Sequence, residues 1–381
     1  MKGKGLLSGV ATVLAIIFVL VLGALGYDFG GLLPASDAEI SPVATLPVLP
    51  TPGRTPLPTP TAIPSWYDIY FTAPTCPPEA AQTGGVDEII ADDIRAATER
   101  VDIASFELNS PPIVDALIEL EKRGLPVRVV TDSDYASDSG INRLRRNGIS
   151  VVEDNRTDFM HDKFIIIDNM YVWTGSMNFM PNDVYCNNNN TVRLVSAELA
   201  DNYRAEMDEM FIQRAFGPRS PNNTPRNSLE IAGVPVENYF GPEQKIAPII
   251  VAKIQSAQQE ILFMAFSFTQ EDIGEAMLTQ AEAGVTVRGV FETVGSDTSY
   301  SYYGDMRNAG LENVTVRQDG NPRIMHHKVI IIDRRITIFG SYNFSASAND
   351  SNDENVVIVN DPDFAGYYIE EFEHVWNEAK P

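Results

Sequence analysis

Residues 160–168 read MHDKFIIID and residues 325–333 read MHHKVIIID, so one nine-residue pattern occurs twice in the chain. Each copy is followed at the same distance by a second match, TGSMNF at residues 174–179 and FGSYNF at residues 339–344. The two copies lie 165 residues apart. Paired motifs in register over this length indicate a duplicated unit, and we expect two similar lobes.

The duplication extends upstream of these motifs. Residues 101–132 and 261–292 each combine a short apolar strand, an amphipathic helix, a glycine and a second strand, and they lie 160 residues apart. We place the five extra residues of the second copy in the 295–304 loop. Strand–helix–strand units with apolar strands predict an α/β fold in which each lobe is a mixed β-sheet flanked by helices.

Composition sets the expected boundaries of the lobes. We assign residues 79–215 to the first lobe and residues 243–381 to the second, with residues 216–242, rich in Pro, Asn and Gly, as the connection. Residues 28–78 are predicted to be a Pro/Thr-rich linker, because nine prolines fall between residues 34 and 64. Proline fixes φ and removes a hydrogen-bond donor, so we expect this linker to be an extended spacer.

The first 27 residues have the pattern of a membrane segment. Lys2 and Lys4 precede 21 uncharged residues, 6–26. A helix of that length reaches about 31 Å, which is enough to cross a hydrocarbon core and longer than most secretory signal cores. We therefore expect residues 1–27 to form a transmembrane anchor, with a cleaved signal peptide as the alternative. The lysines favour an N-terminus inside, so the body is expected outside the cytoplasm, anchored or secreted.

The chain is strongly acidic and poor in metal-ligating residues. Among 381 residues, 28 Lys and Arg face 52 Asp and Glu, for a net charge of −24. Such a surface repels phosphate backbones, which disfavours a protein that coats duplex nucleic acid but not a nuclease with a small basic pocket. Four histidines argue against a His-rich metal centre, and we expect neither metal nor cofactor. Cys76 and Cys186 can pair in an oxidising compartment, but the sequence leaves their pairing open.

The repeated motif carries groups suited to phosphate. Residues two apart on a strand share one face, so His161 lies beside Lys163, and His326 beside Lys328. The Gly-Ser-x-Asn segments add a hydroxyl, an amide and backbone N–H groups where glycine permits close approach. Two imidazoles, two ammonium groups and two amides fit phosphoryl transfer by one histidine nucleophile, with the other histidine as general acid.

These paired motifs resemble the phospholipase D superfamily in its two-motif, single-chain form, over nearly all of residues 86–381. The resemblance implies two lobes packed about a pseudo-dyad, one shared cleft, and metal-independent phosphodiester cleavage through a covalent phosphohistidine. It implies that His161 is the nucleophile and that His326 protonates the leaving alcohol. Four side chains are then expected to bind the non-bridging phosphate oxygens: Lys163, Lys328, Asn178 and Asn343.

The resemblance also implies supporting residues. Ser176 and Ser341 are expected to support the phosphate-binding groups. The motif aspartates, Asp168 and Asp333, are expected to hold the strand and the neighbouring backbone rather than to touch substrate. Because both motifs are in one chain, a second chain is not needed to build the site, and we expect a monomer.

The two lobes differ at one position that bears on the mechanism. Thirteen residues beyond each motif serine, the second lobe has Glu354 and the first has Asn189. Relatives often place a carboxylate there that hydrogen-bonds a catalytic histidine. A carboxylate stabilises imidazolium, whereas an amide orients the ring without that bias. We therefore predict that His326 pairs with Glu354 as the protonated acid and His161 with Asn189 as the neutral nucleophile.

Other singled-out residues receive structural interpretations. His327 alternates to the face opposite His326 and is expected to be packed or on the surface. His374 is expected to pack in the core from a C-terminal helix. The aromatic residues Tyr300, Tyr302 and Tyr303 are either ordinary packing or a rim that touches substrate or membrane.

The fold and the chemistry do not choose the phosphodiester. The anchor and the acidic body favour hydrolysis, or transfer, of phospholipid head groups. The alternatives are an exported endonuclease, which the net charge of −24 disfavours, a phosphatidyltransferase similar to cardiolipin synthase, and a non-catalytic module that binds anionic ligands. Complete motifs in both lobes argue against the last of these.

Overall fold

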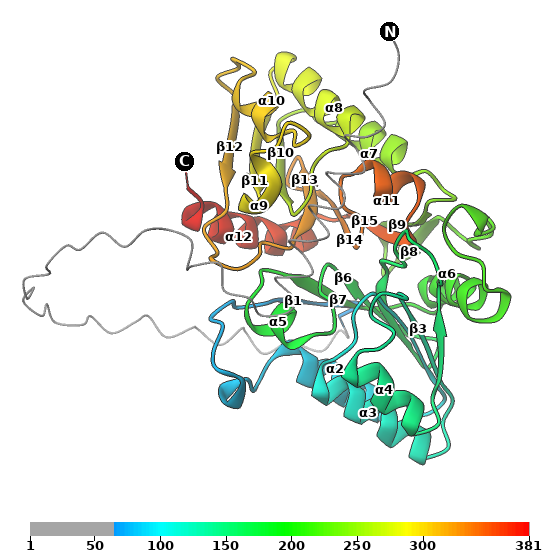
Figure 1. Ribbon diagram of the computed structural model, residues 1–381. Helices are drawn as coiled ribbons and strands as arrows, with labels where there is room; N and C mark the ends of the chain where they lie inside the picture. Colours follow the sequence, from blue (N-terminus) through cyan, green and yellow to red (C-terminus); the bar gives the residue numbers. More distant parts are fainter. Residues whose placement is uncertain (1–64, 381) are drawn as a thin grey trace, which may run out of the picture. The chain divides into compact units, whose positions relative to one another are not determined.

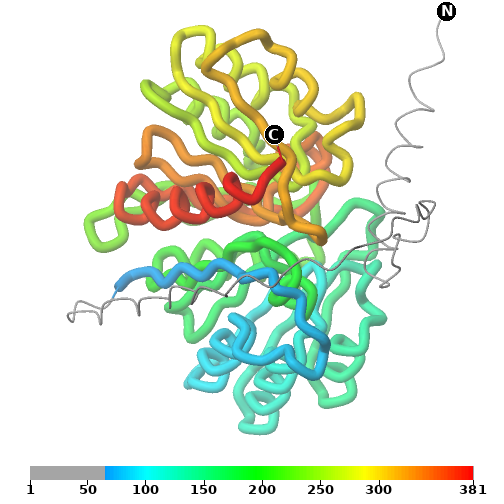
Figure 2. Tube along the Cα trace, turned by 90° about the vertical axis from the view of Figure 1, so that its left-hand side faces the viewer, coloured from blue at the N-terminus to red at the C-terminus, as the bar shows by residue number. Residues whose placement is uncertain are grey.

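The computed structural model describes residues 65–380. The predicted transmembrane segment, residues 1–27, and the linker up to residue 64 lie outside the described residues. Within residues 65–380, no helix is both long and apolar enough to cross a membrane. The described residues form one compact unit of two halves, drawn blue to green and yellow to red in Figure 2.

The first half is built on a seven-stranded mixed sheet in the order β1-β7-β6-β5-β2-β3-β4. β2, β3 and β4 are parallel, whereas β5, β6, β7 and β1 join the sheet by antiparallel pairing. The strands are β1 (Tyr67–Phe71), β2 (Val101–Ser105), β3 (Val127–Thr131), β4 (Ser150–Glu153), β5 (Lys163–Ile167), β6 (Tyr171–Gly175) and β7 (Asn190–Val195). The α-helices are α2 (Val86–Ala96), α3 (Pro111–Lys122), α4 (Ser139–Arg146), α5 (Pro181–Tyr185) and α6 (Ala197–Asp208).

The second half repeats this arrangement in an eight-stranded sheet, in the order β12-β11-β10-β13-β14-β15-β9-β8. Its strands are β8 (Ser228–Ile231), β9 (Val234–Gly241), β10 (Glu260–Ala265), β11 (Thr286–Phe291), β12 (Val314–Gln318), β13 (Lys328–Ile332), β14 (Ile336–Gly340) and β15 (Glu354–Asn360). Its helices are α7 (Ile246–Ile254), α8 (Glu271–Glu282), α9 (Thr293–Ser296), α10 (Tyr303–Arg307), α11 (Ala346–Asp350) and α12 (Pro362–Glu378). Two mixed sheets with matching strand orders confirm the predicted fold class for the described residues.

Both sheets include strands that lie outside the predicted bounds of the two lobes. Residues 67–71 fall in the expected linker but form β1, which pairs with β7. Residues 228–241 fall in the expected connection but form the β8–β9 hairpin, and β9 pairs with β15. β1 and β9 thus take the same place in the two sheets. β1 is at the edge of its sheet, whereas β9 lies between β15 and β8, and both strands lie outside the apolar strand–helix–strand units that set the predicted boundaries.

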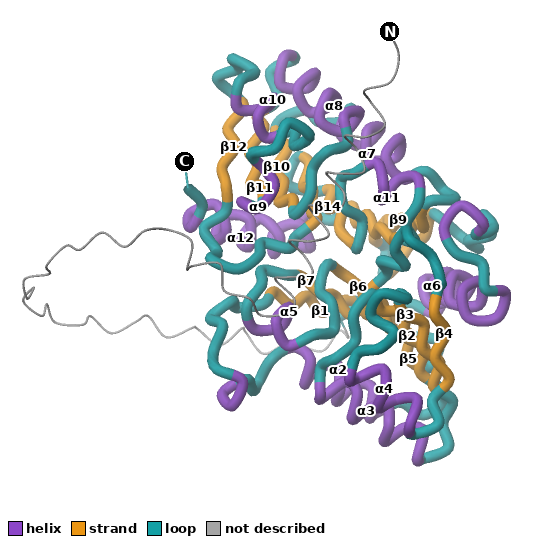
Figure 3. The backbone as a smooth tube through the Cα atoms, viewed as in Figure 1, coloured by secondary structure: helices purple, strands orange, loops and turns teal. Residues whose placement is uncertain are grey.

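Helices cover the outer face of each sheet (Figures 1 and 3). The apolar sides of α2, α3 and α4 pack on the first sheet with Ile103 and Ile165. The apolar sides of α7 and α8 pack on the second sheet with Phe263 and Ile330. This layering follows from the near-continuous apolar strands, which need cover on both faces.

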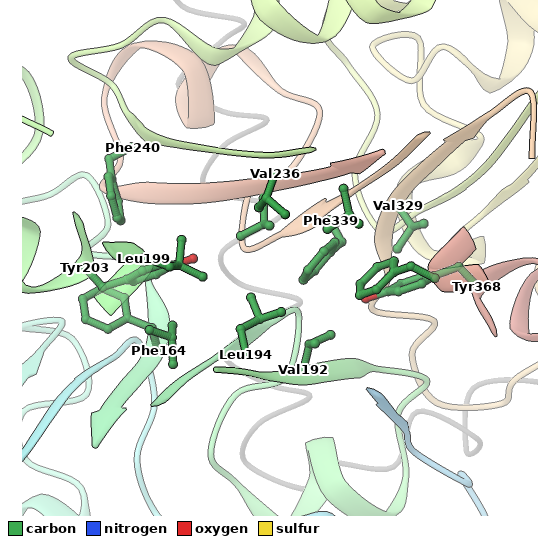
Figure 4. Packing of buried hydrophobic residues seen from close by; sticks show 14 of the residues in the cluster. Phe164, Val192, Leu194, Leu199, Tyr203, Val236, Phe240, Val329, Phe339 and Tyr368 are labelled. Atoms are coloured by element: carbon green, nitrogen blue, oxygen red, sulfur yellow. The ribbon is translucent and has the colours of Figure 1, made fainter. Parts of the chain in front are cut away.

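A third core lies between the two sheets and belongs to both halves. Figure 4 shows Phe164, Val192 and Leu194 of the first sheet facing Phe339 and Val329 of the second. The helices α6 and α12 contribute Leu199, Tyr203, Phe364 and Tyr368 to the same cluster. Because a fully buried large apolar side chain contributes about 1.5–3 kcal/mol, this shared core holds the halves together as one unit.

The two cysteines form a disulfide, Cys76–Cys186, with Cα atoms 4.2 Å apart. It closes a loop across 110 residues and ties the segment after β1 to the end of α5. Cys186 is followed directly by the asparagines 187–190. The bond therefore fixes the stretch of chain that carries Asn189.

Candidate active site

Both motif histidines lie where the two halves meet, just before β5 and β13. His161 N donates to Asp353 O at 2.9 Å, and His326 N donates to Asn188 O at 2.8 Å. Each motif strand therefore begins on a backbone hydrogen bond to the opposite half. The two contacts are reciprocal, as a pseudo-two-fold relation requires.

These backbone contacts determine which side chain meets which histidine. His161 Nδ1 lies 2.9 Å from Glu354 Oε2, and His326 Nδ1 lies 3.0 Å from Asn189 Oδ1. The predicted pairing of His326 with Glu354 and of His161 with Asn189 is therefore wrong, because the pairs cross between the halves. Residue 353 pairs with the backbone of His161, so the next side chain, Glu354, reaches the His161 ring. Sequence spacing within one half cannot reveal a contact of this kind.

The motif serines hold these two partners from their own halves. Ser341 Oγ donates to Glu354 Oε2 at 2.6 Å, and Ser176 Oγ donates to Asn189 Oδ1 at 2.9 Å. The glycine before each serine is needed for close approach. A Cβ on Gly175 would lie 2.3 Å from the carbonyl oxygen of Asn190, and one on Gly340 would lie 2.2 Å from that of Asn355.

The motif lysines are buried beside their histidines. Lys163 Nζ donates to His161 O at 2.7 Å, and Lys328 Nζ donates to His326 O at 2.8 Å. Burial lowers the pKa of Lys163 to about 8. Burial and the nearby Lys163 also hold the pKa of Lys328 well below its usual range. Two ammonium groups with few protein partners provide positive charge for an anionic ligand.

The histidines are nearly enclosed, with 6% of His161 and 7% of His326 exposed. Burial lowers the pKa of His161 to about 4, although Glu354 opposes this shift. Burial, followed by Lys328 and Lys163, holds the pKa of His326 well below its usual range. Both rings are therefore neutral at pH 7 in the free protein. A carboxylate only accepts hydrogen bonds, so the His161 proton is on Nδ1 and its Nε2 carries the lone pair.

The motif asparagines follow the serines, near the start of α5 and α11. The side-chain oxygens of Asn178 and Asn343 are buried and make no hydrogen bond within residues 65–380. Asn178 is 7% exposed. An amide oxygen only accepts hydrogen bonds, so it suits a donor group of a ligand, whereas a phosphate oxygen would be bound by the Nδ2 donor.

The motif aspartates lie away from the histidines, at the turns that follow β5 and β13. Asp168 accepts hydrogen bonds from the backbone N–H groups of residues 98–100 at 2.7–3.1 Å. Asp333 accepts from those of residues 258–260 at 2.8–3.0 Å. Both aspartates have positive φ, 51° and 50°, in turns between antiparallel strands, a conformation that Asp tolerates better than most residues. Their role is to fix the ends of the motif strands.

Comparison with known proteins places both halves in one family. The family model described as "Cardiolipin synthase, PLD-like domain" matches residues 90–211 and 250–376, one segment in each half. The chain belongs to the phospholipase D-like family.

Individual relatives support this assignment. A phospholipase D of Rickettsia felis is 30% identical over 158 residues, which cover 42% of this chain and 78% of that protein. A mitochondrial cardiolipin hydrolase of Homo sapiens is 33% identical over 132 residues, which cover 35% of this chain and 51% of that protein. The chain thus spans about half the length of the first curated relatives it matches.

A solved structure shares the two-half architecture. The phosphatidylserine synthase of Haemophilus influenzae matches with a TM-score of 0.61 and 15% identity, over 82% of this chain and 87% of that one. At this identity the likeness concerns the fold alone.

The phospholipase D-like site contains an aromatic pair that our sequence analysis missed. The Lys163 ammonium lies 5.0 Å from the centre of the Phe106 ring, and the Lys328 ammonium lies 4.8 Å from that of Phe266. The same rings make T-shaped contacts with the motif imidazoles, with ring centres 4.9 Å apart at His161 and 4.8 Å apart at His326. The 160-residue offset between residues 106 and 266 was a usable signal, because it is the offset of the repeated strand–helix–strand units.

Two carboxylates of the first half were also missed. Asp183, on α5, lies 3.4 Å from His326 Nδ1. Glu107 follows Phe106 and is 9% exposed; burial and the nearby Asp183 raise its pKa to about 8. Neither residue has a counterpart in the second half, where Ala348 and Ser267 take their places. Repetition therefore gave no signal for them.

The remaining singled-out residues have different surroundings. His327 is fully buried and contacts Asn190 Nδ2 at 3.0 Å and Glu371 at 3.2 Å. The side chain of His374 is 54% exposed and lies 3.6 Å from Glu378, so its expected core packing is wrong. Tyr302 stacks on Phe268 and Tyr303 is buried against Phe291, whereas Tyr300 is 48% exposed.

Proposed function

We propose that this protein is a phosphodiesterase of the phospholipase D type that cleaves phospholipid head groups through a phosphohistidine. One observation carries the proposal: His161 and His326 lie at one boundary between the halves, each held at Nδ1 by a residue of the opposite half. Their Nε2 atoms are then available to a single phosphodiester.

His161 is the proposed nucleophile. Its neutral ring presents the Nε2 lone pair, which attacks phosphorus as the bond to the leaving alcohol breaks. Attack makes the ring cationic, and Glu354 at 2.9 Å stabilises that cation. The sequence predicted the same role for His161 from an amide partner, Asn189, whereas the partner in the structure is the carboxylate Glu354.

His326 is the proposed acid. It donates its Nε2 proton to the leaving alkoxide, and then accepts a proton from the water that attacks phosphorus and breaks the P–N bond. A bound phosphodiester carries negative charge, which raises the pKa of His326 and favours the protonated form. Lys163, Lys328 and the amides Asn178 and Asn343 bind the non-bridging oxygens as their charge grows in the transition state.

Three observations favour a phospholipid over nucleic acid. The net charge of −24 opposes binding of a long polyanion. The names of the relatives above include a phospholipase D and a cardiolipin hydrolase. Val294 and Tyr300, at the two ends of the loop beyond β11, are 57% and 48% exposed, and side chains of these types suit contact with lipid. The predicted anchor at residues 1–27 and the disulfide suit a body outside the cytoplasm, which we also propose.

Transfer to an acceptor alcohol is the second candidate. The description of the family model that matches both halves includes cardiolipin synthase. The same phosphohistidine would pass its phosphatidyl group to an alcohol in place of water. Hydrolysis and transfer therefore differ only in what attacks the intermediate.

The proposal is tested with the full-length protein and EDTA on phosphatidylcholine vesicles, cardiolipin vesicles and single-stranded DNA in parallel. We expect head-group release that His161→Asn abolishes and that His374→Asn, an exposed histidine away from the site, leaves within about threefold. Added glycerol reports transfer as a phosphatidylglycerol product. Cleavage of DNA without lipid turnover would contradict the proposed substrate, and binding without turnover of any of them would contradict the proposed chemistry.

A further inference from the structure

The two catalytic histidines have unlike partners at Nδ1. Glu354 of the second half gives His161 a negative charge, whereas Asn189 of the first half gives His326 a neutral amide. An acid that passes through imidazolium gains most from a nearby carboxylate. At the position equivalent to Glu354, the first half has Asn189, so His326 receives no carboxylate from there.

A carboxylate reaches His326 from a different position. Asp183 Oδ1 lies 3.4 Å from His326 Nδ1, and the Asp183 side chain is 7% exposed. Asp183 belongs to α5, which lies between the Gly-Ser-x-Asn segment and Asn189. The equivalent residue of α11 is the fully buried Ala348, so this carboxylate exists only in the half that lacks the glutamate.

Asp183 also sets the orientation of Asn189. Asn189 Nδ2 lies 3.1 Å from Asp183 O and 3.3 Å from Asp183 Oδ1. With its N–H groups turned to Asp183, the amide presents Oδ1 to His326 Nδ1 and to Ser176 Oγ, which uses both lone pairs. Asp183 Oδ1 accepts in addition from the backbone N–H of Asn178 at 3.3 Å.

The charges around Asp183 keep it able to act at neutral pH. Burial raises the pKa of Asp183 to about 6, against the lowering effects of the Asn178 N–H, Lys163 and Lys328. Glu107 is the acidic neighbour, and burial keeps it largely protonated at pH 7. Asp183 is therefore mostly ionised there, with two lysines and His326 facing it.

We propose that Asp183 is the carboxylate partner of His326: the Nδ1–H of His326 is shared between Asn189 Oδ1 and Asp183 Oδ1, and the charge of Asp183 stabilises the imidazolium that protonates the leaving alcohol. This inference rests on the proposed function and adds a positioning residue to it. In the first half, the carboxylate thus lies at residue 183 on α5, six residues before Asn189, which is the position equivalent to Glu354.

The test compares two lipids that share the phosphatidyl group and differ in the leaving group. Choline requires protonation as it leaves, whereas p-nitrophenolate does not. The parameter kcat/KM reports the steps up to departure of the leaving group, so slow hydrolysis of the intermediate does not mask the effect. Asp183→Asn keeps the size of the side chain and removes its charge.

We expect Asp183→Asn to lower kcat/KM for phosphatidylcholine about 10- to 100-fold and that for phosphatidyl-p-nitrophenol by less than about threefold. Asn189→Asp in the Asp183→Asn background should restore most of the loss. Asp87→Asn is the matched control: Asp87 is 1% exposed and hydrogen-bonds Ser110 and Tyr185, away from the histidines. It should leave the ratio of the two substrates unchanged. Equal losses on both lipids in Asp183→Asn, or no loss, would overturn the proposal.

A second measurement needs no turnover and separates the two proposals. In the His161→Asn background, NMR titration of His326 should give a lower pKa in Asp183→Asn than with Asp183 present, by about one unit. An unchanged His326 pKa would overturn the role of Asp183. Failure of the otherwise unaltered protein to cleave any lipid would instead contradict the proposed function, while the titration still decides the role of Asp183.

Discussion

At the scale of single residues, the site depends on what each ionisable group faces. Glu354 Oε2 accepts from both His161 and Ser341, and its Oε1 accepts from Asn352 Nδ2 at 3.2 Å. Both oxygens of this carboxylate therefore accept hydrogen bonds, and the side chain is fully buried. It accepts from His161 Nδ1 and so fixes the tautomer of the ring, and in the proposed mechanism it balances the charge of the phosphohistidine.

Glu354→Gln should therefore impair the nucleophile severely. An amide at this place can donate to Nδ1 and favour the wrong tautomer, so we expect kcat/KM to fall about 10²- to 10⁴-fold for both leaving groups. The matched control is Glu371→Gln, a buried glutamate 3.2 Å from the non-catalytic His327. A small loss in Glu354→Gln, comparable to the control, would show that the carboxylate is dispensable.

The alkaline side of the pH profile should report Lys163. Its pKa is lowered by burial to about 8, so the ammonium is present below that pH and is lost as pH rises through it. We expect kcat/KM to decline from about pH 8 upward, measured at constant ionic strength on one lipid. A profile that stays flat to pH 10 would mean that Lys163 keeps its charge in the active protein.

At the scale of elements, the turns that end the motif strands position the histidines. Asp168 and Asp333 were recognised in the sequence because they end the repeated nine-residue pattern, and the strands β5 and β13 because their residues are apolar and β-branched. The strands β1 and β9 were not recognised, since each is added to its sheet by pairing with a strand distant in the sequence, β7 or β15. Asp183 and Glu107 could not be found by repetition, because only the first half has them.

Asp168→Ala should lower stability more than activity. The substitution removes the acceptor of three backbone N–H groups, and we expect the free energy of unfolding to fall by about 1–3 kcal/mol. Burial acts to raise the pKa of Asp168, but these hydrogen bonds outweigh it and the pKa is lowered. The stabilisation is therefore present above about pH 4 and is lost as pH falls through the lower folded-state pKa.

Chemical denaturation of both proteins at several pH values checks this prediction. The difference between Asp168→Ala and the unaltered chain should shrink on acidification, while kcat/KM of the folded variant stays within about threefold. Asp333→Ala should also lower the free energy of unfolding, because Asp333 accepts from three backbone N–H groups in the second half. A difference independent of pH would contradict the account of the turn.

At the scale of the whole molecule, the candidate site is built by contacts between the halves. Duplication and the family resemblance predicted the lobes and all the motif residues. They did not predict the crossed pairs, because backbone bridges between residues 160 and 353 and between 188 and 325 exist only in the assembled fold. Each half thus completes the site of the other.

Removal of the Cys76–Cys186 disulfide should loosen that assembly. The bond closes a 110-residue separation and holds the chain next to Asn189. For the double variant Cys76→Ser/Cys186→Ser we expect a free energy of unfolding lower by about 2–4 kcal/mol and a reduced kcat. Thermal unfolding with and without reductant checks this, and an unaltered Tm on reduction would contradict it.

The central claim is that one phosphodiester is attacked by His161 within a site shared by both halves. The most direct measurement is peptide mapping of the acid-labile phosphoryl adduct after a brief reaction of the full-length His326→Asn protein with phosphatidyl-p-nitrophenol, whose leaving group needs no acid. We predict an adduct on the peptide that carries His161 and none in the His161→Asn protein. An adduct on His326 in the His161→Asn protein, or turnover by the unaltered protein with no histidine adduct, would contradict the account.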